Sequence, residues 1–167
     1  MMLDNAKAYL AEHNCFPKLI CSPMEEDCGI PEDYFDVVYS IYAVGWASDI
    51  NALFKRIASY LKKDGIFIFN WKHPISSSVV LENEDLIFDK AYFDEEWQSI
   101  IVHDMEIKLR SLKISTYINA LAEAGFVIER MEEQSSESSL KMNGVLTDRI
   151  KKAQKIPLSF VFKARKA

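Results

Sequence analysis

His73, Trp46 and Trp71 are the residues whose chemistry is easiest to place from the sequence. His73 precedes Pro74 and follows an apolar run at 66–71, IFIFNW, that is typical of a strand. A histidine at a strand end titrates near neutral pH and suits acid–base catalysis, although a turn-stabilising role fits it as well. The two tryptophans can frame a substrate or hold a cation through cation–π contacts, or they can be plain packing aromatics.

Glycines are sparse, and their spacing excludes one kind of ligand loop within the chain. There are five, and the closest pair, Gly29 and Gly45, is 16 positions apart. Loops that cradle phosphates or dinucleotides need several glycines within a few residues, because the backbone must approach the ligand closely. This chain therefore contains no such loop.

Length and composition favour one globular domain over residues 1–167. Hydrophobic residues make up 49% of the chain and charged residues 27%, values that argue against disorder. The net charge of −5 disfavours a nucleic-acid binder. No apolar run is long enough to cross a membrane and no signal peptide is visible, so we expect a cytoplasmic protein without membrane contact.

Charge is distributed unevenly along the chain. Residues 82–96 hold seven acids and one base, whereas residues 149–166 hold seven bases and no acid. A basic stretch of this kind can contact phosphates. We favour the simpler interpretation, in which these bases form the solvated face of a closing helix and strand.

The three cysteines, Cys15, Cys21 and Cys28, form no C-x-x-C pair. An odd number without a secretion signal indicates free thiols in a reducing compartment. A zinc site with the nearby His13 is conceivable, but the spacing matches no common zinc motif. Buried apolar cysteines are the favoured interpretation.

Apolar patterning predicts an α/β fold. Residues 35–42, FDVVYSIY, are apolar on both faces, as in a parallel strand between two helix layers. A helix that Ser48 or Asp49 caps follows, and then the strand at 66–71, which together make a βαβ crossover. The expected strands are 18–21, 36–41, 65–70, 126–133 and 157–164. The expected helices are 3–13, the capped helix to about residue 61, 115–124 with Ser115 as its cap, and a short one within 147–155.

Residues 72–110 fit this alternation less well. They combine a serine run, an acidic segment and scattered aromatic residues. We expect a lid or insertion, with short strands near 86–89 and 105–110.

Five segments in this order resemble the class I S-adenosylmethionine-dependent methyltransferases, of the Rossmann-like small-molecule type. Together they span nearly the whole chain, and each is similar to a strand, a helix or a turn of the second part of that fold. The segments are FDVVYSIYAVGW (35–46), LFKRIASYLKKDGIFIF (53–69), WKHP (71–74), STYINALAEAGFVIERMEE (115–133) and IPLSFVFKARK (156–166).

The resemblance implies a mostly parallel methyltransferase sheet with a final antiparallel strand. The strand order would be 36–41, 65–70, 157–164 and 126–133. It also implies an enzyme that transfers a methyl group from S-adenosylmethionine to a small molecule, with His73 as the candidate base. The implied cofactor contacts are Ser22, Met24, Ser40, Ile41, Tyr42 and Ala43. The implied substrate contacts are Trp46, Trp71, Tyr92, Phe93 and His103, the last three within the insertion.

Some of these positions depart from the family or have a second interpretation. The family usually places an aspartate beside the adenine, where this chain has Ser22 or Met24. Ile41 suits the core better than a site, and Ser40 and Tyr42 fit either role.

The family's first strand, glycine loop and ribose-binding acid have no counterpart in this sequence. MLDNAKAYL (2–10) resembles the helix that follows the family's second strand. We therefore expect a methyltransferase sheet truncated at its N-terminal side, whose cofactor binding is in question because that loop and acid hold the cofactor. The alternative is a non-catalytic remnant that folds or dimerises without cofactor.

Without that first strand, the strand at 36–41 would have an unpaired edge, and natural proteins cover such edges. The strand at 18–21, a second copy of the chain, or the helix at 3–13 could each cover it. We favour the first two, and so expect either a rearrangement within residues 1–30 or a homodimer.

Overall fold

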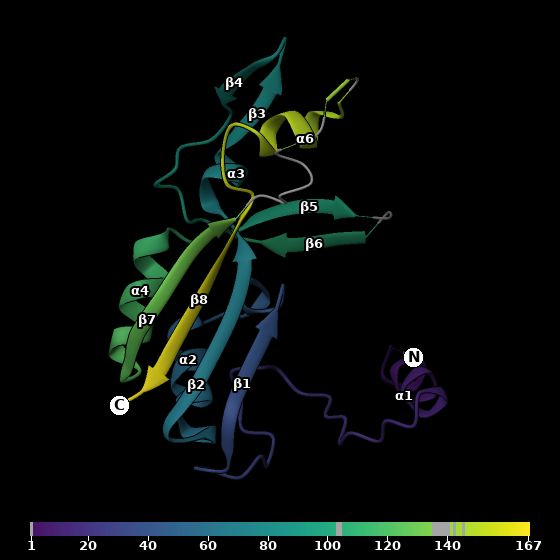
Figure 1. The fold of residues 1–167 in the computed structure, drawn as a ribbon, viewed down its shortest axis with the longest axis vertical. Helices are drawn as coiled ribbons and strands as arrows, with labels where there is room; N and C mark the ends of the chain where they lie inside the picture. The colour runs from purple at the N-terminus through teal and green to yellow at the C-terminus, as the bar shows by residue number, and fades with distance from the viewer. Residues whose placement is uncertain (1, 103–104, 135–140, 142, 145) are drawn as a thin grey trace.

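The computed structural model describes residues 2–102, 105–134, 141, 143–144 and 146–167. Figure 1 shows a twisted sheet with helices against it, two hairpins at one end and an outlying N-terminal helix. The sheet strands are β1 (Phe35–Ile41), β2 (Leu61–Lys72), β7 (Phe126–Gln134) and β8 (Ser159–Lys166). The helices are α1 (Met2–Glu12), α2 (Ile50–Tyr60), α3 (Pro74–Ser78), α4 (Ile114–Glu123) and α6 (Asp148–Ala153), with a 3-10 turn, η1, at Val44–Trp46.

The predicted strand order is confirmed, since the sheet runs β1-β2-β8-β7. The expectation of a mostly parallel sheet needs correction, because among the described residues only β1 and β2 pair in parallel. β8 lies antiparallel between β2 and β7, and this single insertion makes both of its pairings antiparallel. The fold is therefore an α/β sheet of mixed pairing, with the strand order that the resemblance implied.

One face of the sheet carries the core. Helices α2 and α4 lie on this face (Figure 1), and phenylalanines from β2 and β8 belong to the same buried cluster as residues of these helices. Phe69 is the centre of this cluster, with ring centroids 4.9 Å from Phe67 and 5.4 Å from Phe162. Side chains alternate between the faces of a strand, so the odd-numbered residues of β2 and the even-numbered residues of β8 supply the core.

The opposite face is open, and here the prediction that β1 is buried on both sides is wrong. Val37, Tyr39 and Ile41 of β1 are 52%, 71% and 68% exposed. Ile68 of β2, which pairs with Tyr39, is also exposed. The apolar character of both faces of β1 was predicted correctly. Among the described residues, however, helices pack on only one face of the sheet.

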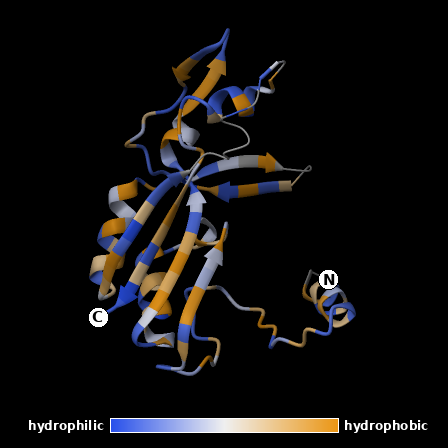
Figure 2. Ribbon diagram, viewed as in Figure 1, coloured by the Kyte–Doolittle hydropathy of each residue, from blue (hydrophilic) through white to orange (hydrophobic). Residues whose placement is uncertain are grey.

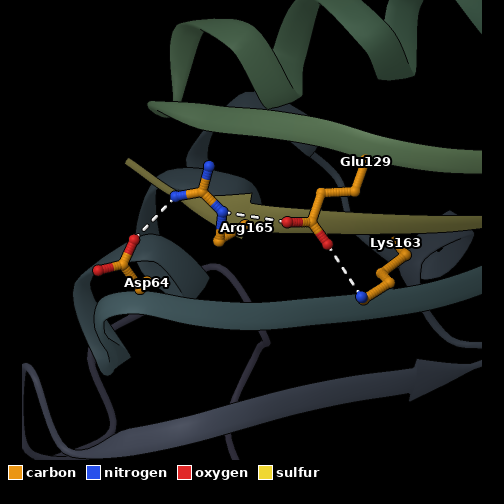
Figure 3. A network of polar contacts seen from close by, with 4 residues as sticks. All are labelled: Asp64, Glu129, Lys163 and Arg165. Carbon is orange, nitrogen blue, oxygen red and sulfur yellow. Dashed lines mark hydrogen bonds and ion pairs between the residues drawn. The ribbon is translucent and has the colours of Figure 1, made fainter.

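Charged residues occupy the other half of the open face. Figure 3 shows Glu129 of β7 between Lys163 and Arg165 of β8, at 2.9 and 3.0 Å. Arg165 also reaches Asp64 at 2.8 Å. Figure 2 shows the contrast, with orange along β2 and blue interrupting β7 and β8.

The N-terminal region does not cover the edge of β1. The expected strand at 18–21 is absent, since these residues have no regular structure. Helix α1 is formed as predicted but lies away from the sheet (Figure 1). Two of the three expected covers are thus missing, and β1 is the last strand of its sheet. The third, a second copy of the chain, stays a prediction.

The insertion after β2 forms two antiparallel hairpins. These are β3 (Val79–Glu82) with β4 (Asp85–Phe88), and β5 (Gln98–Val102) with β6 (Met105–Leu109). The expected short strands near 86–89 and 105–110 correspond to β4 and β6. Helix α6 contacts the first hairpin through an ion pair between Lys151 and Glu84. Part of the basic stretch therefore neutralises the acidic insertion.

The two main helices begin in different ways. Asp49 caps α2 as predicted, and its carboxylate accepts from the backbone N–H groups of Asn51 and Ala52 at 2.9 and 3.0 Å. The predicted Ser115 cap of α4 is wrong, because the N-cap is Lys113, which has no side-chain cap bond. Glu95, from the insertion, accepts from the Lys113 N–H at 2.7 Å instead.

Candidate functional site

Strand β1 ends in a strained turn at Tyr42. Tyr42 has a φ of 49°, a left-handed conformation that is uncommon for a bulky residue. The side-chain oxygen of Asn70, at the end of β2, accepts from the Tyr42 N–H at 2.9 Å and holds this turn. Strained backbone of this kind clusters at functional sites. The turn directs Tyr42 into one cavity while Ile41 and Ala43 line another.

The first cavity, here called the edge cavity, has a volume of about 540 Å³ and lies between β1, α2 and the 20–30 loop. Five of the six predicted cofactor residues line it. They are Ser22, Met24, Ser40, Ile41 and Ala43. Its lining is mainly apolar and includes no carboxylate.

Polar contacts hold the 20–30 loop beside this cavity. Glu25 accepts from the Ser48 backbone N–H at 2.9 Å and from the Ser48 hydroxyl. Burial of the Glu25 carboxyl opposes its ionisation, but the Ser48 hydrogen bonds outweigh this and lower its pKa. Inside the cavity, Cys28 Sγ lies 3.7 Å from the Tyr60 hydroxyl, and burial followed by this contact raises the pKa of Tyr60 to about 12.

The second cavity, here called the aromatic cavity, has a volume of about 560 Å³ and lies at the ends of β1 and β2. Tyr42, Trp46 and Trp71 line one part of it. Trp46 meets Trp71 edge to face with ring centroids 5.8 Å apart, and Trp46 is half exposed whereas Trp71 is buried. Lys72, Arg149 and Lys152 also line this cavity.

Gly45, in the turn η1, makes room for the Trp71 indole. A Cβ atom at this position would lie 1.9 Å from Trp71 Cε2, closer than any real contact. The backbone of η1 therefore packs directly on the indole ring. Only glycine permits this approach, which fixes one wall of the aromatic cavity.

His73 is buried and both of its ring nitrogens are engaged. Nδ1 accepts from the Ile75 N–H at 3.1 Å and caps α3, so Nε2 carries the proton and donates to Glu133 at 2.8 Å. Burial lowers the pKa of His73, and Glu133 only partly offsets this. This geometry supports the turn-stabilising interpretation, because neither nitrogen is available to a substrate.

The insertion residues predicted to contact substrate lie apart from both cavities. Tyr92 is half-buried and Phe93 is 79% exposed, and they pack against each other with ring centroids 5.5 Å apart. Neither lines the edge cavity or the aromatic cavity. His103 lies outside the described residues.

The cysteines do not have the burial that was expected. Cys15 and Cys21 are exposed, and Cys28 is half-buried in the edge cavity. Among the described residues, no group of His, Cys, Asp and Glu is arranged to hold a metal ion.

Comparisons with known proteins agree with this geometry. Residues 1–69 match the sequence profile of the family described as "Methyltransferase domain". An S-adenosylmethionine-dependent methyltransferase of Mesorhizobium loti has a similar fold, with a TM-score of 0.75 at 20% identity, over 99% of this chain and 76% of that one. Another, from Clostridium acetobutylicum, has a TM-score of 0.68 at 18% identity, over 99% and 71%.

Residues 1–69 thus resemble this methyltransferase family, and the chain as a whole has the fold of S-adenosylmethionine-dependent methyltransferases. A curated relative from Haemophilus influenzae, described as an uncharacterized protein, is 27% identical over 156 residues. The match covers 86% of this chain and 59% of that relative's length.

Within this methyltransferase fold, sequence reasoning missed Asn70. An amide at the end of the apolar run IFIFN is the signal that could have indicated it, because polar residues at the ends of parallel strands often belong to sites. No helix in the described parts of the chain has the length and apolar character needed to cross a membrane.

Proposed function

We propose that this chain serves S-adenosylmethionine-dependent methylation of a small molecule. The edge cavity would hold the cofactor and the aromatic cavity the methyl acceptor. The observation that carries the proposal is the strained turn at Tyr42, since Ile41 and Ala43 line the edge cavity and Tyr42 between them lines the aromatic cavity. A donor and an acceptor separated by one turn of backbone can be aligned for transfer.

The residues of the edge cavity fit only part of the cofactor. Its apolar lining, with Met24 and Ile41, suits the adenine ring and the thioether chain. No carboxylate among the lining residues is available for the ribose hydroxyls, which that group normally needs. We therefore expect weak cofactor binding by this chain alone.

The chain's own contribution to catalysis would be positioning. The bound cofactor supplies an activated methyl group. Tyr42, Trp46 and Trp71 would orient the acceptor and exclude water, and Asn70 would fix the Tyr42 turn. Placing two reactants in line can supply most of the acceleration of such a reaction. His73 would support the fold of this region rather than remove a proton.

A titration of the isotope-labelled chain with S-adenosylhomocysteine, followed by NMR, tests the proposal. We expect a dissociation constant of roughly 1 mM, with shifts at Ser22, Met24 and 40–43, and no measurable heat at micromolar concentrations. Shifts confined to other regions, or none at all, would favour the alternative of a non-catalytic remnant. A saturable heat at micromolar concentration would show that the present residues suffice for tight binding.

Two matched variants separate specific binding from general effects. Ser22→Phe places a large ring at an exposed position that lines the edge cavity, and should abolish the shifts. Ser99→Phe makes the same change on β5, away from that cavity, and should leave them intact. Equal loss in both variants would contradict the assignment of the cavity.

A further inference from the structure

Besides its rings, the aromatic cavity is lined by three cationic side chains. Lys72 comes from the end of β2, whereas Arg149 and Lys152 lie three residues apart on α6 and share a helix face. No acidic residue lines this cavity. Lys152 donates to the backbone carbonyl of Ser76 at 2.6 Å and to that of Val79, which fixes its ammonium group in place.

Two acidic residues of the neighbouring elements are engaged elsewhere. Glu84 pairs with Lys151, on another side of α6, and Glu133 accepts from His73. Neither Lys72 nor Arg149 has an ion-pair partner in the described part of the chain. The cavity thus gathers positive charge that the described residues leave uncompensated.

The electrostatics of the two lysines agree with this geometry. Burial, followed by the nearby Lys90 charge, lowers the pKa of Lys72. Burial, followed by the Lys72 charge, lowers the pKa of Lys152. Like charges that are partly desolvated at one cavity destabilise each other, and a bound anion relieves that repulsion.

We infer that the methyl acceptor is a flat, unsaturated ring that carries an anionic group, a carboxylate or a phosphate. The ring lies against Tyr42, Trp46 and Trp71, and the anion faces Lys72, Arg149 and Lys152. The cavity, at about 560 Å³, is large enough for such a molecule. The inference rests on the proposed function, because it names the substrate class of the same site.

Tryptophan fluorescence quenching in the cofactor-free chain tests this, with benzoate, phenyl phosphate and benzamide as probes. The three share a ring, and only benzamide is uncharged. We expect the better of the two anions to bind at least about tenfold more tightly than benzamide, since charged hydrogen bonds add to affinity. The stronger anion identifies the acceptor as a carboxylate or a phosphate. Equal binding of all three probes would overturn the inference.

Charge-removing variants locate the effect. Lys72→Gln should erase the preference for the anions, and Lys63→Gln, at the opposite end of β2, should retain it. Arg149→Gln, at an exposed position, gives the same test with a smaller loss and little risk to folding, which circular dichroism checks. An undiminished preference in both Lys72→Gln and Arg149→Gln would refute the inference.

The outcome is separable from that of the proposed function, because no cofactor takes part in the quenching experiment. An anion preference that depends on Lys72, combined with no S-adenosylhomocysteine shifts, would refute the proposed function alone. The reverse result would refute the anionic acceptor alone.

Discussion

The two faces of the sheet are built from the same strands but are stabilised in different ways. On the face that α2 and α4 cover, Phe67, Phe69 and Phe162 are almost completely buried. On the open face, Tyr39 and Ile41 are exposed, and the charged residues of Figure 3 come from β7, β8 and the start of β2. Burial of apolar area contributes far more free energy than exposed ion pairs do, so the covered face should hold nearly all of the stability.

Removing one aromatic side chain from each face should give the largest contrast. Phe69, which is 1% exposed, leaves a cavity in the core when changed to Ala, so Phe69→Ala should cost about 3–5 kcal/mol of unfolding free energy. Tyr39→Ala, at 71% exposure, should change it by less than about 0.5 kcal/mol. Urea denaturation measures both. A comparable loss for Tyr39→Ala would mean that the open face is covered in solution, and the comparison would fail.

Overpacking at Gly45 should have the next largest effect. Gly45→Ala forces a methyl group into the Trp71 ring and should cost about 1–3 kcal/mol, with a shift in tryptophan fluorescence. In the double variant with Trp71→Leu, the two losses should be less than additive, because the clash is gone. Strict additivity would show that Gly45 acts through something other than the indole.

The buried His73 should make the covered face sensitive to pH. Because burial holds its folded pKa below the ordinary value of 6.5, the unfolded chain binds the proton more readily. The stability that neutral, buried His73 contributes is therefore complete above pH 6.5, and it is lost as the pH falls from there towards the folded pKa. His73→Asn keeps a capping acceptor without the titration. Denaturation across this range should show a shallower acid decline in the variant, and an unchanged decline would contradict it.

The ion pairs of the open face should matter least. Lys163, followed by Arg165, lowers the pKa of Glu129, and the group is solvent-exposed. Glu129→Gln should lower the melting temperature slightly at low salt, and the difference should vanish as salt is added. Glu123→Gln, an equal charge change at the end of α4, is the control. A large loss that persists at high salt would show that this network is more than a screened surface feature.

Features set by nearby residues were predictable from the sequence. Apolar runs located most of the strands, the family resemblance implied their order, and Asp49 lies only two residues from the first N–H group that it caps. The pattern of β1 showed that both of its faces are apolar. It could not show whether a cover exists, because that depends on what else packs there, and the described residues leave one face open.

Features set by distant residues were missed. Glu95 reaches the start of α4 from 18 positions away, whereas the sequence pattern near the helix start indicated Ser115. Asn70 holds the Tyr42 turn across 28 positions. The short run at 18–21 looked like a strand, but a strand forms only with a partner. Of the site, the sequence indicated the edge cavity, because five of the six predicted cofactor residues line it. The cationic residues of the aromatic cavity come from β2 and α6, which are far apart in the sequence, so only the structure could bring them together.

Within the part of the chain that the structure describes, strand β1 has a neighbour on one side only. In a parallel pair, alternate residues turn their N–H groups towards the partner strand, so every second amide proton between Phe35 and Ile41 faces away from β2. Hydrogen exchange along β1 should therefore alternate between slow and fast from one residue to the next. β2, with strands on both sides, should exchange slowly along its whole paired length. If a second copy of the chain pairs with this edge, the fast amides of β1 become slow as the protein concentration rises.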